Sequence, residues 1–323
     1  MNIDNVTGRS TGTTLGLDIG GTKILGVVLD AQGTVVREHR VPSPVHDLPL
    51  LVKACRSLIE ELDPDATRPV GVGAAGLVDM QGELSYAPNL PGVRNAPLQA
   101  DIAAVTGRRV VADNDANVAA LGEVAYGAAI GARFALMVTL GTGIGGGLVI
   151  DGRVLRGAHG FAGEIGHVTV ERDGPLCACG ERGHWEAIAS GSALGRMARE
   201  LIATGSGAGI LAAAGGVADD VVGESVATAA AAGDADAIAL LHRYADNVAI
   251  GLANLANVLD PECIVIAGGL VQLGALLFGP LAEAFHNRLE GTEYRPPVPV
   301  LPATLGTRAG AIGAAVLARD LLS

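Results

Sequence analysis

Aromatic residues are scarce in this chain. They make up 3% of its 323 residues, with one Trp, four Tyr and four Phe. The hydrophobic share is nevertheless 49%, which is typical of a globular protein and excludes a disordered one. We therefore expect a core built from Ala, Val, Leu and Ile, in a chain long enough for two domains.

Positive charge is also in short supply. Lys and Arg number 22 against 34 Asp and Glu, a formal net charge of −12. This balance argues against nucleic acid as the main partner, because binding a phosphate backbone needs a basic surface. A single nucleotide is not excluded, since backbone N–H groups and one local cation can hold it.

Cysteines, leader sequences and long apolar runs are few or missing. The four cysteines comprise the Cys177/Cys179 pair and two that stand alone among apolar residues, Cys55 and Cys263. This is no disulfide framework and suits a reducing compartment. The start, "MNIDNVTGRSTGTT", lacks the apolar region of a signal peptide, and no run of 18 apolar residues predicts a membrane span. We expect a cytoplasmic protein without membrane contact.

Strands and helices alternate along the chain, which predicts an α/β fold of two related domains. The segments 13–36 and 134–155 share one pattern of strand, glycine turn and strand, and we interpret them as a repeat. Asp234 is expected to cap a long helix that stops at Pro261. Further strands are expected within 69–79, 108–115, 263–269 and 297–303, and helices within 47–62, 97–107, 116–127, 191–232, 234–261, 273–289 and 308–322.

Two glycine-rich turns follow apolar strands, "DIGGTK" from Asp18 and "GTGIGGG" from Gly141. The second matches G-x-G-x-x-G, but a strand follows it where a dinucleotide-binding fold needs a helix. A P-loop sequence is absent as well. Each turn alone could be an ordinary hairpin turn, whereas the two together with "AGG" after a third strand favour phosphate binding. Asp18 could hold Mg²⁺ through water.

"CACGERGHWE" has the composition of a zinc site. Cys177, Cys179 and His184 supply three soft ligands, and the segment itself offers no fourth. Two free thiols and a buried histidine are the alternative.

The chain resembles the ROK family of sugar kinases and sugar-responsive regulators, within the actin/hexokinase superfamily. The motifs that carry the resemblance run in the family's order over nearly the whole chain: "DIGGTK" (18–23), "PNLPG" (88–92), "DNDAN" (113–117), "LGTGIGGG" (140–147), "GEIGH" (163–167), "CACGERGHWE" (177–186), "LDPECIVIAGG" (259–269) and "LGTRAGAIGAA" (305–315). The resemblance implies two actin-like (ribonuclease H-like) domains around a central cleft. We place the first at 1–117, joined by the C-terminal helix 308–323, and the second, with the zinc segment, at 118–307.

The resemblance also implies site residues. Asp115 is expected to act as the general base on the sugar hydroxyl. Sugar contacts are expected from Gly76, Asn89, Asn114, Asp115, Glu164, His167 and Glu186. Nucleotide contacts are expected from Asp18, Gly20, Gly21, Thr22, Lys23, Gly141, Thr142, Gly143, Gly268 and Gly269.

Each of the carboxylates has a simpler alternative. Asp115 stands just before a helix and could be its N-cap. Glu164 and Glu186 could be ordinary surface charges, although both lie among glycines and possible metal ligands. Trp185 is expected to pack in the core and not to stack on a sugar.

His167, at the end of "GEIGH", is the expected fourth metal ligand. His167, Cys177, Cys179 and His184 would form a closed His₂Cys₂ structural zinc site. The family has cysteine at position 184, so His184 is a departure. Because His167 follows Glu164 closely and His184 precedes Glu186, one ion would hold both glutamates in place.

These expectations favour an ATP-dependent hexokinase of glucokinase type that phosphorylates the 6-hydroxyl, with Mg-ATP and structural zinc. Fructose, N-acetylglucosamine and N-acetylmannosamine remain alternative substrates, and polyphosphate an alternative donor. A DNA-binding repressor is disfavoured because 17 residues precede Asp18, and a sugar sensor without turnover is disfavoured by the intact motifs. Relatives imply a homodimer or homotetramer.

Overall fold

The structure is a computed structural model that describes residues 12–65 and 67–322. The absence of a signal peptide was predicted from residues that lie mostly outside this described part. The chain divides into two compact units. One holds the described residues through Met137 with Gly147–Gly163 and the segment from Thr304, and the other holds Val138–Gly146 and Glu164–Ala303. The domain limits at 117/118 and 307/308 stay a prediction; by contacts, residues 118–137 belong with the first unit.

The first unit is built on a five-stranded sheet of order β3-β2-β1-β4-β7. The hairpin β1 (Thr14–Ile19) and β2 (Lys23–Leu29) is antiparallel, and β3 (Val35–Pro42) continues it. On the other side β4 (Val70–Ala74) and β7 (Val110–Asn114) run parallel to β1. The carboxyl ends of these three parallel strands therefore meet at one edge, where α/β sheets place ligands.

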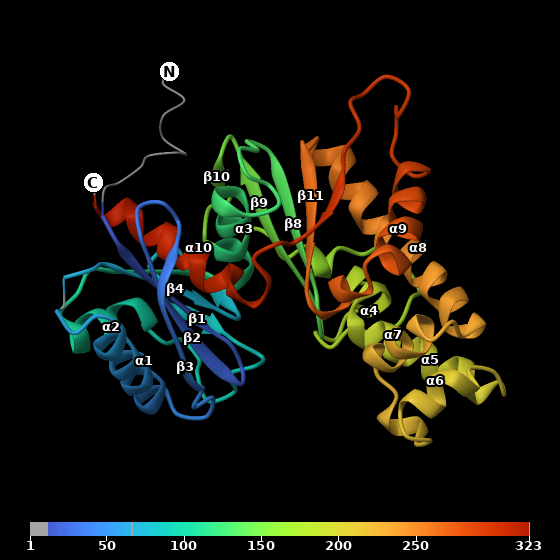
Figure 1. The fold of residues 1–323 in the computed structure, drawn as a ribbon, viewed down its shortest axis with the longest axis horizontal. Helices are drawn as coiled ribbons and strands as arrows, with labels where there is room; N and C mark the ends of the chain where they lie inside the picture. The colour runs from blue at the N-terminus through green and yellow to red at the C-terminus, as the bar shows by residue number, and fades with distance from the viewer. Residues whose placement is uncertain (1–11, 66, 323) are drawn as a thin grey trace. The chain divides into compact units, whose positions relative to one another are not determined.

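Alternation along β2 explains the two layers of helix over this sheet. Ile24 and Val28 join the core cluster that contains α1 (Leu48–Leu62), whereas Leu25, Val27 and Leu29 join the cluster of α10 (Ala309–Leu317). Successive side chains of a strand point to opposite faces, so each face acquires its own apolar surface. Helix α2 (Leu98–Thr106) packs beside α1, and α3 (Asp115–Tyr126) packs beside α10 (Figure 1).

Helix α10 approaches the sheet unusually closely because the contacting residues are small. A Cβ on Gly71 would lie 1.8 Å from the carbonyl oxygen of Ala314, and one on Gly313 would lie 1.6 Å from that of Val118. Only glycine allows backbones to come this near. The "RAGAIGAA" sequence thus fits α10 between β4 and α3.

The second sheet repeats the order of the first. Its order is β10-β9-β8-β11-β12, so in both sheets the first strand lies between the second and the fourth. The repeat predicted for the glycine hairpins is confirmed and extends to the entire sheet. The strands are β8 (Ala135–Leu140), β9 (Ile144–Ile150), β10 (Arg153–Val154), β11 (Cys263–Ala267) and β12 (Val300–Pro302), and a separate two-stranded sheet joins β5 (Leu77–Val78) to β6 (Leu84–Tyr86).

Helices of the second unit divide the predicted Ala-rich region. They are α4 (Trp185–Ala189), α5 (Gly191–Ala203), α6 (Ala208–Ala213), α7 (Gly223–Ala231), α8 (Ala235–Leu259) and α9 (Ala275–His286). The Asp234 side chain accepts a hydrogen bond from the Ala237 backbone N–H at 2.8 Å, which confirms the predicted cap of α8. In the described part of the chain, no helix combines the length and apolar character needed to cross a membrane.

The single tryptophan lies in the core, as predicted. Trp185 is fully buried, and its Nε1 donates to the backbone oxygen of Asn247 at 3.1 Å. Its ring lies against Gly251 of α8, where an added Cβ would be 2.1 Å from the ring.

Candidate active site

The first glycine turn connects β1 to β2 at the edge of the first sheet where the carboxyl ends of β1, β4 and β7 meet. The Gly20 N–H donates to the carbonyl of Lys23 at 3.0 Å, and Thr22 and Lys23 are exposed. A Cβ on Gly21 would lie 3.0 Å from both Cβ and the carbonyl oxygen of Asn89. Glycine at 21 therefore lets "DIGGTK" contact "PNLPG", two motifs distant in sequence.

Asp18 lies near the end of β1, just before this turn, and its side chain faces α10. Its carboxyl carbon would be 2.7 Å from a Cβ on Gly310, so glycine is needed at the helix start. Burial, and after it the negative charge of Asp115, raise the pKa of Asp18 to about 7, while Lys23 acts in the opposite direction. Asp18 and Asp115 are thus electrostatically coupled carboxylates of one unit.

The "DNDAN" motif ends β7 and begins α3. Asn114 is the N-cap of α3, with its Oδ1 accepting from the N–H groups of Ala116 at 2.8 Å and Asn117 at 3.2 Å. The alternative of Asp115 as N-cap is therefore wrong, because Asp115 is the first residue of the helix. The Asn114 amide also donates to the carbonyl of Gly76 at 2.9 Å, which brings together two of the predicted sugar contacts.

The two aspartates of the motif differ in their surroundings. Asp113 is 3% exposed, and its carboxylate accepts from the Asn114 N–H at 2.8 Å and the Asn117 amide at 2.8 Å. Arg156 completes the set with Nε at 2.7 Å from the other oxygen. Asp113 is thus held in a structural role. Arg156, in the loop after β10, was missed by sequence reasoning, since nothing local links it to a residue 43 positions away.

The second glycine turn and "AGG" line one cavity in the second unit. The cavity measures about 420 Å³, and among its lining residues are Gly141, Thr142 and Gly269 from the predicted nucleotide set. Gly268, the residue before Gly269, has a φ of 105°, and a Cβ on it would lie 2.1 Å from the Leu140 carbonyl oxygen. Two glycine motifs remote in sequence are therefore adjacent at the ends of β8 and β11.

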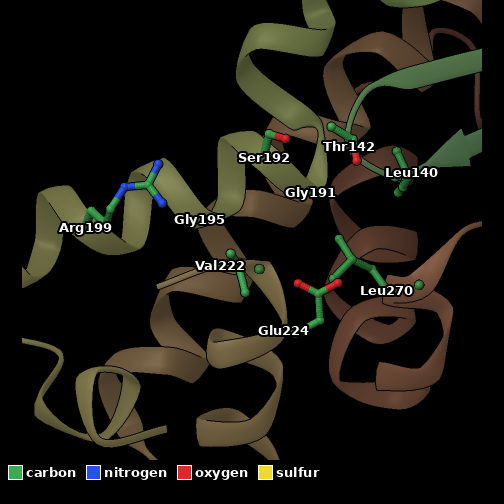
Figure 2. Close-up of a pocket in the computed structure, with 12 residues that line it drawn as sticks. Leu140, Thr142, Gly191, Ser192, Gly195, Arg199, Val222, Glu224 and Leu270 are labelled. Carbon is green, nitrogen blue, oxygen red and sulfur yellow. The ribbon is translucent and has the colours of Figure 1, made fainter. Parts of the chain in front are cut away.

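The rest of the cavity wall was not predicted. The first turn of α5 contributes Gly191 and Ser192, with Gly195 and Arg199 further along, and Val222, Gly223 and Glu224 come from the start of α7 (Figure 2). The Glu224 side chain points toward the space bordered by Thr142 and Leu270 (Figure 2). Within the described residues, no side chain or N–H donates to its carboxylate. The sequence offers only one indication of these wall residues, the short glycine-containing segments at two helix starts, "SGSALG" (190–195) and "VGES" (222–225).

The four predicted metal ligands lie together in the second unit. One donor atom from each of His167, Cys177, Cys179 and His184 falls within 4.8 Å of all the others. Nδ1 of His167 is 3.3 Å from Nδ1 of His184 and 3.9 Å from Sγ of Cys177, and Cys179 Sγ is 3.2 Å from His184 Nδ1. Ligands of a tetrahedral zinc ion lie about 3.3–3.8 Å apart, given bond lengths near 2.0–2.3 Å. The donor set and spacing therefore fit such an ion.

The two predicted glutamates flank this cluster. Nε2 of His167, the ring nitrogen that faces away from the cluster, is 3.9 Å from Oε2 of Glu164. The Glu164 side chain is 46% exposed, and its partial burial raises its pKa, with His167 opposing the rise and the Glu186 carboxylate adding to it. Burial also raises the pKa of the Cys177 thiol to about 11.

Glu186 is half-buried and has both oxygens engaged. Oε2 accepts from the Ile144 N–H of the second glycine turn at 2.9 Å, and the Cys177 thiol donates to Oε1 at 3.6 Å. Glu186 is therefore not an ordinary surface charge. Asn89 and Glu164 are exposed, each in its own unit.

Comparisons with known proteins agree with this arrangement. The ROK family matches residues 14–321 of the chain. The glucokinase of Streptomyces coelicolor is 40% identical over 313 residues, which cover 96% of this chain and 98% of that protein. The N-acetylmannosamine kinase of Escherichia coli is 33% identical over 95% of this chain and 98% of that protein.

A solved structure also aligns over the full length. The ROK family glucokinase from Streptomyces griseus, crystallised with glucose and AMPPNP, has a TM-score of 0.83 and 38% identity over 96% of this chain and all of that one. The sequence motifs, the shared strand order of the two sheets and the full-length relatives all indicate the same family. The chain belongs to the ROK family, and sugar kinases are its full-length relatives.

Proposed function

We propose that this protein transfers the γ-phosphoryl group of ATP to the 6-hydroxyl of a hexose, with glucose as the preferred acceptor. The observation that carries the proposal is the 420 Å³ cavity whose wall joins the second glycine turn, the first turn of α5 and Gly269. Backbone N–H groups at glycine turns and helix starts are suited to phosphate oxygens. The identity to a glucokinase over 313 residues supports glucose.

The donor would lie along this cavity. Its phosphates would meet Gly141, Thr142 and the start of α5, where Ser190 caps the helix. The Glu224 carboxylate would repel phosphate but can accept hydrogen bonds from the two ribose hydroxyls. Val222 and Leu270 would border the base. Gly143 and Gly268 would act by holding the cavity wall in shape.

Asp115 would accept the proton of the attacking hydroxyl. Phosphoryl transfer requires positioning, charge neutralisation and one carboxylate near the nucleophile. Asp113 is unsuited to this role, because Arg156 and two further donors already occupy its oxygens. In the same unit, Asp18 would hold Mg²⁺ through water, and Gly20, Gly21, Thr22 and Lys23 would meet phosphate oxygens.

The remaining polar residues would recognise the sugar. Carboxylates and amides pair well with vicinal hydroxyls, and a hydrogen bond to a charged acceptor contributes about 1.5–3 kcal/mol. Sugar contacts are proposed for Gly76, Asn89, Asn114, Glu164, His167 and Glu186.

Zinc is the metal that His167, Cys177, Cys179 and His184 would hold. With four protein ligands the ion would have a structural role and no open position for chemistry. The Nδ1 atoms of both histidines face the cluster, which leaves Nε2 of His167 directed at Glu164. A carboxylate on the outer nitrogen of a metal-bound histidine orients the ring.

N-acetylmannosamine is the second candidate substrate, because a kinase for that sugar is 33% identical over 95% of this chain. The test is ADP release with Mg-ATP over glucose, fructose, mannose, N-acetylglucosamine and N-acetylmannosamine. A kcat/KM for glucose above that for every other sugar would support the proposal. A preference for another sugar would correct the substrate, and no ADP release with any of them would remove the kinase assignment. The cytoplasmic location and the homodimer or homotetramer remain predictions.

A further inference from the structure

The Glu186 side chain contacts the second glycine turn and holds it in place. Besides the Ile144 hydrogen bond to Glu186 Oε2 at 2.9 Å, a Cβ on Gly143 would lie 2.1 Å from the same oxygen. The carboxylate therefore fills the place that any side chain at 143 would occupy. Its contact fixes the position of the turn where β9 begins.

The opposite end of the turn is held by the same stretch of chain. The Gly191 N–H donates to the Gly141 carbonyl at 2.7 Å, and a Cβ on Gly191 would lie 2.8 Å from that oxygen. Glu186 and Gly191 belong to the consecutive helices α4 and α5. The segment that follows the cluster thus holds the turn at both Gly141 and Ile144.

The same glutamate also lies beside the cluster. Its Oε1 is 3.6 Å from the Cys177 sulfur, which donates a hydrogen bond as a free thiol and would carry no proton as a zinc ligand, so the connection to the metal runs through the chain. His184 is the N-cap residue of α4, and Trp185, fully buried, lies between His184 and Glu186 in the chain. A shift of His184 would therefore be passed to Glu186 through one rigid helical turn.

From this arrangement we infer that Glu186 is a positioning residue that couples the metal cluster to the phosphate-binding turn. Loss of the metal then weakens nucleotide binding, and not only sugar binding. This inference rests on the proposed function, because it takes the turn as a phosphate site. It assigns Glu186 a role distinct from a sugar contact.

The test is calorimetric titration with ADP and Mg²⁺ in the absence of sugar, which needs no turnover. The full-length protein is measured with its metal, after removal of zinc by 1,10-phenanthroline and dialysis, and after reloading with Zn²⁺. The same series is run on Glu186→Ala and Glu186→Gln. Glu181→Gln is the matched control, because Glu181 is an exposed carboxylate of the same loop. Zinc content is measured by emission spectroscopy in every sample.

We expect removal of zinc to raise the Kd for ADP about tenfold in the wild type, the size of one lost hydrogen bond to a charged group. Reloading should reverse this rise. Glu186→Ala should raise the Kd about as much with zinc still bound and should show no further rise on stripping. Glu186→Gln should raise the Kd for ADP less than Glu186→Ala, because the Gln amide oxygen can still accept from the Ile144 N–H. Glu181→Gln should bind ADP as tightly as the wild type and respond to zinc removal in the same way.

Equal ADP affinity of loaded and stripped wild type would overturn the coupling while the kinase assignment stands. Wild-type affinity in Glu186→Ala would overturn the role of Glu186. No ADP binding by the loaded wild type would overturn both this inference and the proposed function. If circular dichroism shows that Glu186→Ala does not fold, Gly143→Ala replaces it, because its methyl group would displace Oε2. Unchanged ADP affinity in Gly143→Ala would likewise refute the role.

Discussion

Replacing Arg156 by alanine should damage both the stability of the first unit and turnover. The guanidinium Nε lies 2.7 Å from a carboxylate oxygen of Asp113, whose side chain is 4% exposed. Removing one partner of a buried ion pair costs about 3–5 kcal/mol. The Arg156 side chain is 30% exposed, so water can enter the vacated space, and Asp113 keeps two other donors. We therefore expect a loss of about 2 kcal/mol.

The effect on turnover follows from the hydrogen bonds that connect Asp113 to the start of α3. Asp113 accepts from the Asn114 N–H, and Asn114 caps the helix on which Asp115 is the first residue. A displaced Asp113 should shift this turn, lowering kcat tenfold or more, because small misplacements of a catalytic group are costly. The KM for ATP should change little, because neither Asp113 nor Arg156 lines the proposed donor cavity.

Stability is measured by urea unfolding followed by circular dichroism, because the single tryptophan lies in the second unit and would report that unit alone. Arg153→Ala is the matched control, as Arg153 is an exposed arginine on β10. A free energy of unfolding within about 0.5 kcal/mol of wild type, the range of ordinary surface substitutions, together with wild-type kcat would refute this reasoning.

Four further predictions concern single side chains. Asp115→Asn should abolish ADP release while hexose binding by calorimetry persists; retained turnover would remove Asp115 as the base. Cys177→Ser should lose zinc by emission spectroscopy and raise the KM for the sugar; full zinc occupancy would contradict the ligand set. Wild type should bind ADP about tenfold more tightly than 2′-deoxy-ADP, and Glu224→Gln should reduce this ratio toward one by calorimetry; a ratio that Glu224→Gln leaves unchanged would exclude the ribose contact. Asp63, buried and paired with Arg68 and Arg108, has a pKa held below its usual range. Its stabilising effect should therefore be complete above about pH 5 and should decline as the pH falls further, so the loss of stability in Asp63→Asn, measured by urea unfolding, should shrink in acid; a loss independent of pH would be the contrary result.

Three of the four metal ligands could be predicted from a single sequence motif. Cys177, Cys179 and His184 are close in sequence, so their spacing alone indicated a common site. His167 was added by resemblance to the family, and the structure places its Nδ1 3.3 Å from that of His184. The assignment of Asp115 over Asp113 as base likewise came from resemblance, and the hydrogen bonds of Asp113 now supply a physical reason for it.

Local chemistry is what the sequence by itself determined. Short apolar runs specified the strands, Asp234 specified the start of α8, and the glycine turns specified the two related hairpins. Each of these depends on residues within a few positions of one another. The tertiary structure alone decided the partnerships of Arg156 with Asp113 and of Ile144 with Glu186, whose members lie 43 and 42 residues apart. It also decided that Glu224 faces the cavity, because which side chains meet across such distances depends on strand order and helix packing, which no local pattern encodes.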